Sequence, residues 1–362
     1  MPALSSAFLV HAEDLSDFSK AVLQKMGVPL ADAEVVSTAL VDADLRGLGT
    51  HGAVRLILYS KLFQEGLVNP RPKIRLISES SSHVLIDNDY GLGFLGSVKA
   101  MALCIRMAPK TGIAMAGVRN SSHFGAAGYY ALMAAEQNLV GFATSNSYPV
   151  MAPPGTTTPV HGNNPFAFAF PAGKRFPILV DMATSVASQG KIKQYGNEGK
   201  TIPLGWAYNR EGKPTEDPRA FFLLAPFGEG GYKGYGLALA MDVLAGVLTG
   251  SLFAQNFVSG PGSRGCGHFF LAFDPQRFMP LNEFRKRTGE MIEQMKMASH
   301  LDGDQGEIYH PGERGFLRKT KWIREGIPML SSTLQQLDQL ADGMNLPRLR
   351  RDDHPCGAND KV

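Results

Sequence analysis

The central part of the chain lacks the regular alternation of strand and helix that a doubly wound parallel sheet requires. Between residues 140 and 235 the apolar segments are short and strand-like, and loops rich in Gly, Pro, Asn and Thr separate them. Only one short helix, at about 185–195, is predicted in this stretch. Parallel strands need helical crossovers, so the pattern predicts an α/β protein of the α+β type, with a mixed, mostly antiparallel sheet flanked by helices.

Hydrophobic periodicity places the other elements. Helices are predicted where apolar residues recur every three or four positions, and strands where they alternate or form short runs. The predicted helices lie at about 14–27, 31–46, 53–65, 97–107, 126–137, 236–248, 281–297 and 334–344. The predicted strands lie at 74–86, 112–119, 140–144, 166–170 and 178–182.

The N-terminal helices and the C-terminal segment are predicted to share a domain. We expect a helical, substrate-side domain over 1–119, to which 300–345 returns, and a sheet domain over 120–299. Residues 346–362 are charged and contain Pro355 and Gly357, so they are expected to form a frayed tail.

Composition limits the classes of partner. With 362 residues, 44% of them hydrophobic, the chain can bury a large core. A net charge of +3 and the lack of basic clusters interleaved with aromatics argue against nucleic-acid and membrane partners and favour a small molecule. The three cysteines are far apart, which predicts neither a disulfide framework nor a zinc site and favours the cytoplasm.

The first chemically informative segment is the turn Gly49-Thr50-His51-Gly52, which Arg55 follows. Imidazole titrates near neutrality, and guanidinium binds a carboxylate with two hydrogen bonds. Arg46 precedes the turn and adds positive charge that would attract an anion. Solvated surface arginines are the simpler alternative, but the glycines around His51 favour close approach of a ligand to the backbone. The turn predicts proton transfer to a carboxylate-bearing substrate.

A second histidine turn, Asn120-Ser121-Ser122-His123-Phe124-Gly125, follows a predicted strand and opens a helix. Free amide groups at a helix start can receive an anion, so a phosphate or a nicotinamide amide fits there. The alternative is a capping serine and a histidine that bonds only to backbone.

The glycine run at 91–96 matches the G-x-G-x-x-G dinucleotide fingerprint and lies between a strand and a helix. That fingerprint also needs an acidic residue about 20 positions further on, and the corresponding segment Ala-Pro-Lys-Thr-Gly-Ile-Ala has none. A glycine turn that permits close helix–strand packing is therefore favoured over a phosphate loop.

Three further segments carry polar side chains at the ends of predicted elements. Gly162-Asn163-Asn164-Pro165 and the segment from Asp181 to Ser185 suit a polar ligand beside an apolar wall, or are plain turns. Lys233 lies among glycines that open an apolar helix, which is another candidate anion site. No metal-binding or serine-hydrolase motif is present.

Taken together, the motifs resemble the malate/L-lactate dehydrogenase family, whose dinucleotide-binding domain is not a Rossmann fold. Its members include sulfolactate and ureidoglycolate dehydrogenases, diketogulonate reductase and piperideine-2-carboxylate reductase. The resemblance runs from the first helix to about residue 330 and rests on the order and spacing of these segments: Asp44-Leu-Arg-Gly-Leu-Gly-Thr-His-Gly, Asn120-Ser-Ser-His-Phe-Gly, Gly162-Asn-Asn-Pro, Asp181-Met-Ala-Thr-Ser, Gly231-Tyr-Lys-Gly-Tyr-Gly, Gly267-His-Phe-Phe and Pro311-Gly-Glu.

The resemblance implies a homodimer that binds NAD or NADP in the 120–299 sheet domain. It places the proton donor at His51, with His123 as the alternative. At the position before His51, where the family has a serine, this chain has Thr50. It places the substrate carboxylate at Arg55, with Arg46 and Asn163 nearby. The implied cofactor contacts are Ser122, His123, Gly125, Asn146, Asn164, Asp181, Met182, Ala183, Lys233, Gly234, Pro311, Gly312 and Glu313.

The implied reaction is reversible hydride transfer between nicotinamide and C2 of a small 2-oxo or 2-hydroxy acid of the malate, lactate or sulfolactate kind. One alternative is reduction of a cyclic ketimine carboxylate such as piperideine-2-carboxylate. In the imine reductases the resemblance places an acid where this chain has Lys191, which favours the oxo acid. A catalytically silent ligand-binding protein is the alternative from another class, and Thr50 is the residue most compatible with it.

Overall fold

The computed structural model describes residues 7–257, 264–301 and 306–352. The chain divides into two compact units. Unit 1 comprises Met1–Pro72, Pro171–Ile178 and Asn282–Val362, and unit 2 comprises Lys73–Phe170 and Leu179–Leu281. Residues 353–362 of the predicted frayed tail lie outside the described part of the chain.

Unit 1 is mainly helical and brings an early and a late segment of the described chain together. Strand β1 (Ala7–Val10) pairs antiparallel with β12 (Ile327–Leu330), so that Ala7 lies opposite Leu330. Residues of the N-terminal and C-terminal segments therefore share one unit. Its helices are α1 (Ala12–Lys25), α2 (Leu30–Leu45), α3 (Arg55–Gln64), α8 (Leu281–Lys296), which starts at its border, α9 (Glu313–Glu325) and α10 (Ser331–Gly343).

Local sequence explains the first helices well. Helix α1 buries Leu15, Phe18 and Val22, which recur at the spacing of one helix face. It ends at Lys25, and Gly27 then adopts a φ of +90°, a conformation that favours glycine and stops a helix. Helix α9 was not predicted, because most of its surface is charged and it buries only Glu313, Phe316 and Trp322.

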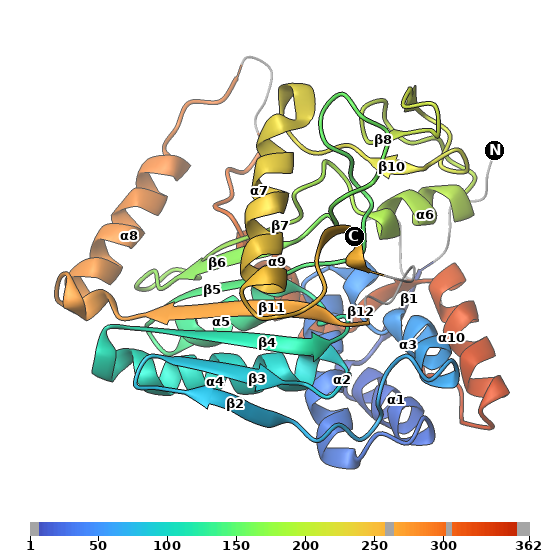
Figure 1. Cartoon of the computed structure of the whole chain (residues 1–362), viewed down its shortest axis with the longest axis horizontal. Coiled ribbons are helices and arrows are strands. Elements are labelled where there is room, and N and C mark those ends of the chain that lie inside the picture. The colour runs from blue at the N-terminus through green and yellow to red at the C-terminus, as the bar shows by residue number, and fades with distance from the viewer. Residues whose placement is uncertain (1–6, 258–263, 302–305, 353–362) are drawn as a thin grey trace. The chain divides into compact units, whose positions relative to one another are not determined.

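Unit 2 is built on a seven-stranded sheet in the order β2-β3-β4-β11-β5-β6-β7 (Figure 1). Strands β3 and β4 are parallel, and the pairs β2 with β3, β4 with β11, β11 with β5 and β5 with β6 are antiparallel. The predicted mixed, mostly antiparallel sheet is confirmed. Its strands are β2 (Arg75–Glu79), β3 (His83–Asp87), β4 (Ile113–Ser121), β5 (Val140–Ser145), β6 (Phe166–Phe170), β7 (Ile178–Met182) and β11 (Cys266–Phe273).

The strand β11, in the middle of this sheet, was not predicted. Its sequence CGHFFLAF is an almost continuous apolar run, and most of its residues are buried. A strand covered on both faces does not alternate between polar and apolar residues, so its periodicity carries no strand signal.

Helices of unit 2 pack on the sheet. Helix α4 (Gly93–Thr111) contacts β3, β4 and β11, and α5 (Ala127–Glu136) contacts β5 and β6. Because β2, β3 and α4 all belong with β4, the predicted domain boundary at residue 119 falls inside unit 2.

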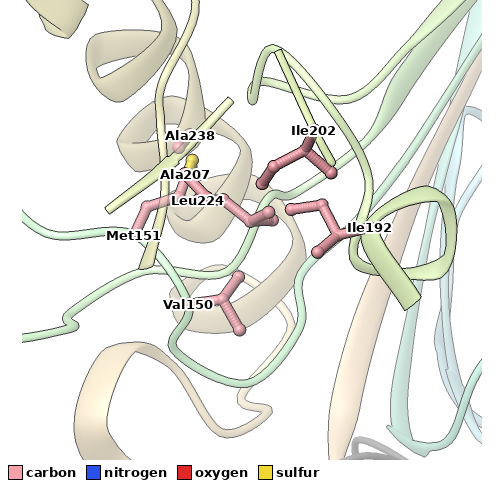
Figure 2. Close-up of a cluster of buried hydrophobic side chains, with 7 residues drawn as sticks. All are labelled: Val150, Met151, Ile192, Ile202, Ala207, Leu224 and Ala238. Atoms are coloured by element: carbon pink, nitrogen blue, oxygen red, sulfur yellow. The ribbon is translucent and has the colours of Figure 1, made fainter. Parts of the chain in front are cut away.

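A separate apolar cluster supports the loops that lie between β5 and helix α7 (Tyr232–Asp242) in the sequence (Figure 2). Helix α6 (Gln189–Asn197) starts later than predicted because the hydroxyl of Ser188 accepts a hydrogen bond from the amide of Lys191 and caps the helix there. A small sheet of β10 (Leu223–Leu224), β8 (Ala207–Tyr208) and β9 (Pro214–Thr215) was not predicted. The cluster consists of Val150, Met151, Ile192, Ile202, Ala207, Leu224 and Ala238.

Helix α7 (Tyr232–Asp242) continues into a wider helical turn, Val243–Val247. The predicted apolar helix is confirmed, but one side of it is exposed. Among the described residues, no helix combines the length and hydropathy that crossing a membrane requires. The exposed apolar side chains of this segment are Tyr232, Leu239, Val243, Val247 and Leu248.

Candidate active site

The first histidine turn lies in unit 1 between α2 and α3, where Gly49–His51 form a short 3₁₀ turn. The hydroxyl oxygen of Thr50 lies 3.1 Å from Nδ1 of His51. The guanidinium Nε of Arg55 donates a 2.5 Å hydrogen bond to the carbonyl oxygen of Thr50. The three predicted residues are therefore linked by hydrogen bonds within one turn.

This turn keeps the imidazole of His51 neutral. Burial and, to a smaller extent, the positive charge of Arg55 lower the pKa of His51 to about 3. At neutral pH the ring can accept a proton. An anion bound to Arg55 would offset the guanidinium charge and make protonation of the ring easier.

The other arginine of the turn has a different environment. Arg46 is 7% exposed, and its Nε donates to Oδ2 of Asp42 at 2.7 Å. Its guanidinium lies 4.5 Å from the ring centroid of Phe316, and Lys319 also contacts Asp42 at 2.5 Å. These contacts join the end of α2 to α9 through an ion pair, and a role of Arg46 in substrate binding stays a prediction.

The second histidine turn lies in unit 2 after β4. The hydroxyl of Ser122 is buried and donates to the carbonyl oxygen of Gly91 at 3.0 Å. The amide of Gly125 donates to Nδ1 of His123 at 3.3 Å. Ser122 therefore fixes the turn, while the ring of His123 is partly exposed.

The glycine run at 91–96 packs against this turn. A Cβ at Gly93 would lie 2.3 Å from the carbonyl oxygen of Ser122, and one at Gly96 would lie 2.7 Å from Oδ1 of Asn88. The glycines thus allow helix α4 to approach the backbone after β4, as the packing interpretation predicted.

Asp181 and the start of α5 lie together in unit 2. Oδ2 of Asp181 accepts a hydrogen bond from the amide of Gly128 at 3.0 Å, in the first turn of α5. A Cβ at Gly128 would lie 2.5 Å from that oxygen. The side chain of Met182 is 38% exposed. The structure thus brings the end of β7 next to the helix that the second histidine turn opens.

The remaining predicted cofactor segments of unit 2 are joined through backbone hydrogen bonds. The amide of Thr184 donates to the carbonyl oxygen of Asn163 at 3.0 Å. The amide of Phe227 donates to the carbonyl oxygen of Thr184 at 3.2 Å. The amide of Gly234 donates to the carbonyl oxygen of Phe227 at 3.0 Å. These bonds place three segments next to one another. They are the residues just after β7, including Ala183, the loop of Asn163, and the segment that holds the exposed Lys233.

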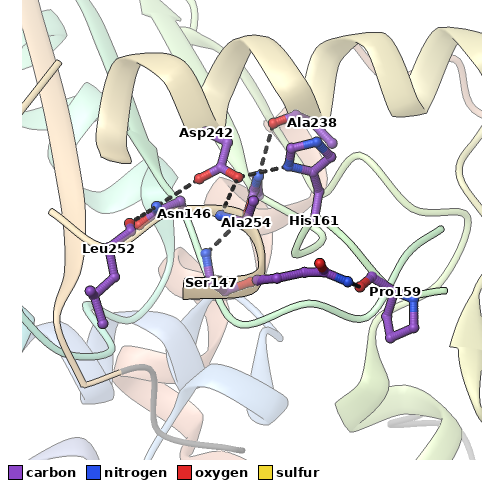
Figure 3. Close-up of polar contacts among 10 residues, drawn as sticks. Asn146, Ser147, Pro159, His161, Ala238, Asp242, Leu252 and Ala254 are labelled. Atoms are coloured by element: carbon purple, nitrogen blue, oxygen red, sulfur yellow. Dashed lines mark hydrogen bonds and ion pairs between the residues drawn. The ribbon is translucent and has the colours of Figure 1, made fainter. Parts of the chain in front are cut away.

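Two of the predicted cofactor residues are buried within a polar network (Figure 3). Nδ2 of Asn146 donates to Oδ1 of Asp242 and to the carbonyl oxygen of Leu252, both at 2.7 Å. Nδ1 of His161 lies 2.7 Å from Oδ2 of Asp242. Asn164 accepts from the amide of Ser147 and donates to the carbonyl oxygen of Ala238.

This network fixes loops around α7, and the sequence did not point to two of its members. His161 and Asp242 are both buried. The one sequence signal for this network was Asp242, a carboxylate inside an otherwise apolar helix. A buried carboxylate needs a hydrogen-bonding or charged partner.

The loop at 311–313 belongs to unit 1. Gly312 has a φ of +88°, and Glu313 begins α9. The carboxylate of Glu313 accepts from Lys296 at 2.8 Å and from the amide of His310 at 3.1 Å. Pro311 is exposed, whereas Glu313 is buried by these contacts.

A family model described as malate/L-lactate dehydrogenase matches residues 10–338. The chain belongs to the malate/L-lactate dehydrogenase family. This membership confirms the resemblance that the sequence motifs indicated, and with it a hydroxy acid dehydrogenase.

Relatives from this family align over almost the whole chain. A malate dehydrogenase of Pyrococcus horikoshii is 44% identical over 343 residues, which cover 92% of this chain and 94% of that protein. An L-sulfolactate dehydrogenase of Methanocaldococcus jannaschii is 36% identical over 329 residues, covering 90% and 94%. The solved structure of the Pyrococcus horikoshii malate dehydrogenase has a TM-score of 0.86 to this chain, with 39% identity and coverage of 95% and 97%.

Proposed function

We propose that this family member transfers a hydride reversibly between a nicotinamide cofactor and C2 of a small 2-hydroxy acid, with His51 and Arg55 as its catalytic and substrate-binding residues. The observation that supports this proposal is the linked arrangement of Thr50, His51 and Arg55 in one turn. A proton acceptor beside a carboxylate-binding group is what oxidation of a 2-hydroxy acid requires.

His51 handles the proton. Because its Nδ1 faces the hydroxyl of Thr50, its Nε2 is the nitrogen that meets the substrate. In oxidation the hydroxyl proton passes to Nε2, while the hydrogen on C2 leaves with both electrons of its bond. In reduction the protonated ring returns the proton to the oxygen as the hydride arrives at C2.

Arg55 holds the substrate carboxylate. Its Nε is committed to the carbonyl oxygen of Thr50, which orients the guanidinium. The two terminal nitrogens can then bind both oxygens of a carboxylate. This contact places C2 beside the imidazole and brings the negative charge that favours protonation of His51.

The residues of unit 2 fit a nicotinamide dinucleotide. Oγ1 of Thr184 is buried and has no hydrogen-bond partner among the described residues, so it is free to bind a polar ligand group. Asp181 at the start of α5 and the exposed Lys233 add an acceptor and a positive charge for the cofactor's hydroxyl and phosphate groups. When bound, the cofactor supplies or accepts the hydride, and NAD and NADP are both candidates.

We also propose that the chain forms a homodimer through α7. The exposed side chains Leu239, Val243 and Val247 recur every four residues and are 46%, 46% and 51% exposed. A contiguous apolar row of this kind is typical of a protein–protein interface. A Val243→Glu variant should shift the protein from dimer to monomer in sedimentation equilibrium, with Lys286→Glu on exposed α8 as the control. A monomeric wild-type protein would contradict the proposal.

The cytoplasmic location stays a proposal. The buried thiols of Cys104 and Cys266 are free, which suits a reducing compartment. Secretion of the protein in its native host, measured by cell fractionation, would contradict it.

A turnover assay tests the proposed function. The purified protein is given NADH or NADPH with pyruvate, oxaloacetate, sulfopyruvate or piperideine-2-carboxylate, and cofactor absorbance is followed. We expect turnover with at least one oxo acid. We expect His51→Asn to reduce kcat by ~10² or more with little change in cofactor Kd. Turnover of the cyclic imine alone, or cofactor binding without any turnover, would contradict the proposal.

A further inference from the structure

A buried carboxylate lies beneath the catalytic turn. Asp44 belongs to the last turn of α2 and is 5% exposed. Its Oδ2 accepts a hydrogen bond from the amide of Ala53 at 2.7 Å. Ala53 follows His51 by two residues, so this bond ties the chain just after the imidazole to the end of α2.

The same carboxylate packs on Gly52. A Cβ at Gly52 would lie 1.9 Å from Oδ1 of Asp44 and 2.2 Å from Oδ2. The φ of Gly52 is −87°, which any residue can adopt. Space for the carboxylate, and not backbone conformation, therefore requires glycine next to His51.

Backbone hydrogen bonds also hold the turn between α2 and α3. The amide of Gly47 donates to the carbonyl oxygen of Asp44 at 2.9 Å, and the amide of His51 donates to that of Leu48 at 2.7 Å. The amide of Arg55 in turn donates to the carbonyl oxygen of Gly52 at 2.9 Å. These backbone bonds fix the turn that holds His51 and Arg55, and its residues Gly52 and Ala53 contact the Asp44 side chain.

We propose that Asp44 is a positioning residue of the active site: its carboxylate fixes the backbone at Gly52 and Ala53 and so sets the positions of His51 and Arg55. This inference rests on the proposed function of those two residues. Burial raises the pKa of Asp44 to about 7, with the Ala53 hydrogen bond opposing the shift. A carboxyl oxygen in either protonation state can accept the Ala53 hydrogen bond, so acceptance and packing, more than charge, carry the role.

Two substitutions separate positioning from charge. Asp44→Ala removes the acceptor, and we expect kcat/KM for the oxo acid to fall ~10- to 100-fold, because displacement of a catalytic group by about 1 Å has effects of this size. Asp44→Asn keeps an acceptor oxygen, and we expect it to retain activity within ~3-fold. Cofactor Kd should stay unchanged in both variants, since the residues proposed above to fit the cofactor, Asp181, Thr184 and Lys233, lie in unit 2. Asp32→Ala in the first turn of α2 is the matched control.

Gly52 tests the same contact from the other side. We expect Gly52→Ala alone to lower kcat/KM, because its Cβ would collide with the carboxylate. In an Asp44→Ala background the collision is gone, so Gly52→Ala should cause little further loss, a non-additive pair. This cycle is informative even if one single variant is poorly stable.

The outcomes distinguish the two proposals. A wild-type protein with no activity on any oxo acid overturns the proposed function. If the wild type is active, unchanged kcat/KM in Asp44→Ala, a loss in Asp44→Asn equal to that in Asp44→Ala, or additive effects of the two sites overturn the role of Asp44. A fall in cofactor affinity that parallels the fall in kcat/KM also overturns it, because general destabilisation would explain both.

Discussion

The imidazole of His268 stacks on the ring of Phe124, with centroids 4.6 Å apart and planes 5° from parallel. Phe124 follows His123 directly. The ring nitrogens of His268 each lie 2.8 Å from a serine hydroxyl, Ser145 on β5 and Ser121 on β4. The central strand β11 thereby holds the second histidine turn through one buried, neutral imidazole.

That imidazole should make the protein sensitive to acid. Burial lowers the pKa of His268 to about 3, while the unfolded chain has the ordinary value of 6.5. Between these values the unfolded chain binds more protons, so His268 makes the free energy of unfolding fall as pH decreases from 6.5 towards 3. Urea unfolding at pH 7.5 and 5.0 should show a smaller difference in His268→Gln than in the wild type. At pH 7.5 the variant should be less stable by ~1–3 kcal/mol. The exposed His300→Gln serves as the control, and an equal effect there would contradict the assignment.

The pH dependence of catalysis follows from the turn at residues 49–52. Because the pKa of His51 is lowered to about 3 in the free protein, we expect kcat/KM for hydroxy acid oxidation to lack an acid limb near pH 6.5. Reduction needs the protonated ring, so its kcat/KM should rise as pH falls from 8.5 to 5. Initial rates across this range test both directions. An acid limb near 6.5 that disappears in His123→Gln would transfer the proton-handling role to His123.

Arg55 should not tolerate lysine. Its Nε is bound to the carbonyl oxygen of Thr50, and a single ammonium group cannot keep that bond and also bind two carboxylate oxygens. We expect Arg55→Lys to raise KM for the oxo acid ~10- to 100-fold, measured by initial rates. Arg71→Lys is a matched control, because Nε of Arg71 also donates to a carbonyl oxygen, that of Gly27 at 3.1 Å. An unchanged KM in Arg55→Lys would mean that the carboxylate binds elsewhere.

Gly128 should matter for cofactor binding. A Cβ there would lie 2.5 Å from Oδ2 of Asp181, so Gly128→Ala should displace that carboxylate. We expect cofactor Kd, measured by fluorescence titration, to rise ~10-fold, while Gly289→Ala in α8, where nothing lies within 4 Å, leaves it unchanged. Equal Kd values in the two variants would show that Asp181 does not contact the cofactor.

Elements that carry their own periodicity could be predicted from the sequence. The strands β6 and β7 lie at the residues that the apolar runs indicated, and α1 ends where Gly27 stops it. The proximity of Thr50, His51 and Arg55 could also be predicted, since a hydroxyl, an imidazole and a guanidinium within six residues must lie near one another. These features depend on neighbouring residues, and neighbouring residues are what a sequence displays directly.

Tertiary structure alone decided the features that join distant segments. The place of β11 between β4 and β5 depends on strand pairing over more than 100 residues, and a buried strand has no local signature. The role of Asp242 emerges only when Asn146 and His161 reach it. The contact of the Asp44 carboxylate with the amide of Ala53 likewise depends on how the turn after α2 folds back on the helix. The sequence shows which polar groups will need a hydrogen-bond partner if they are buried. Which residues become those partners is determined by the packing of the whole chain.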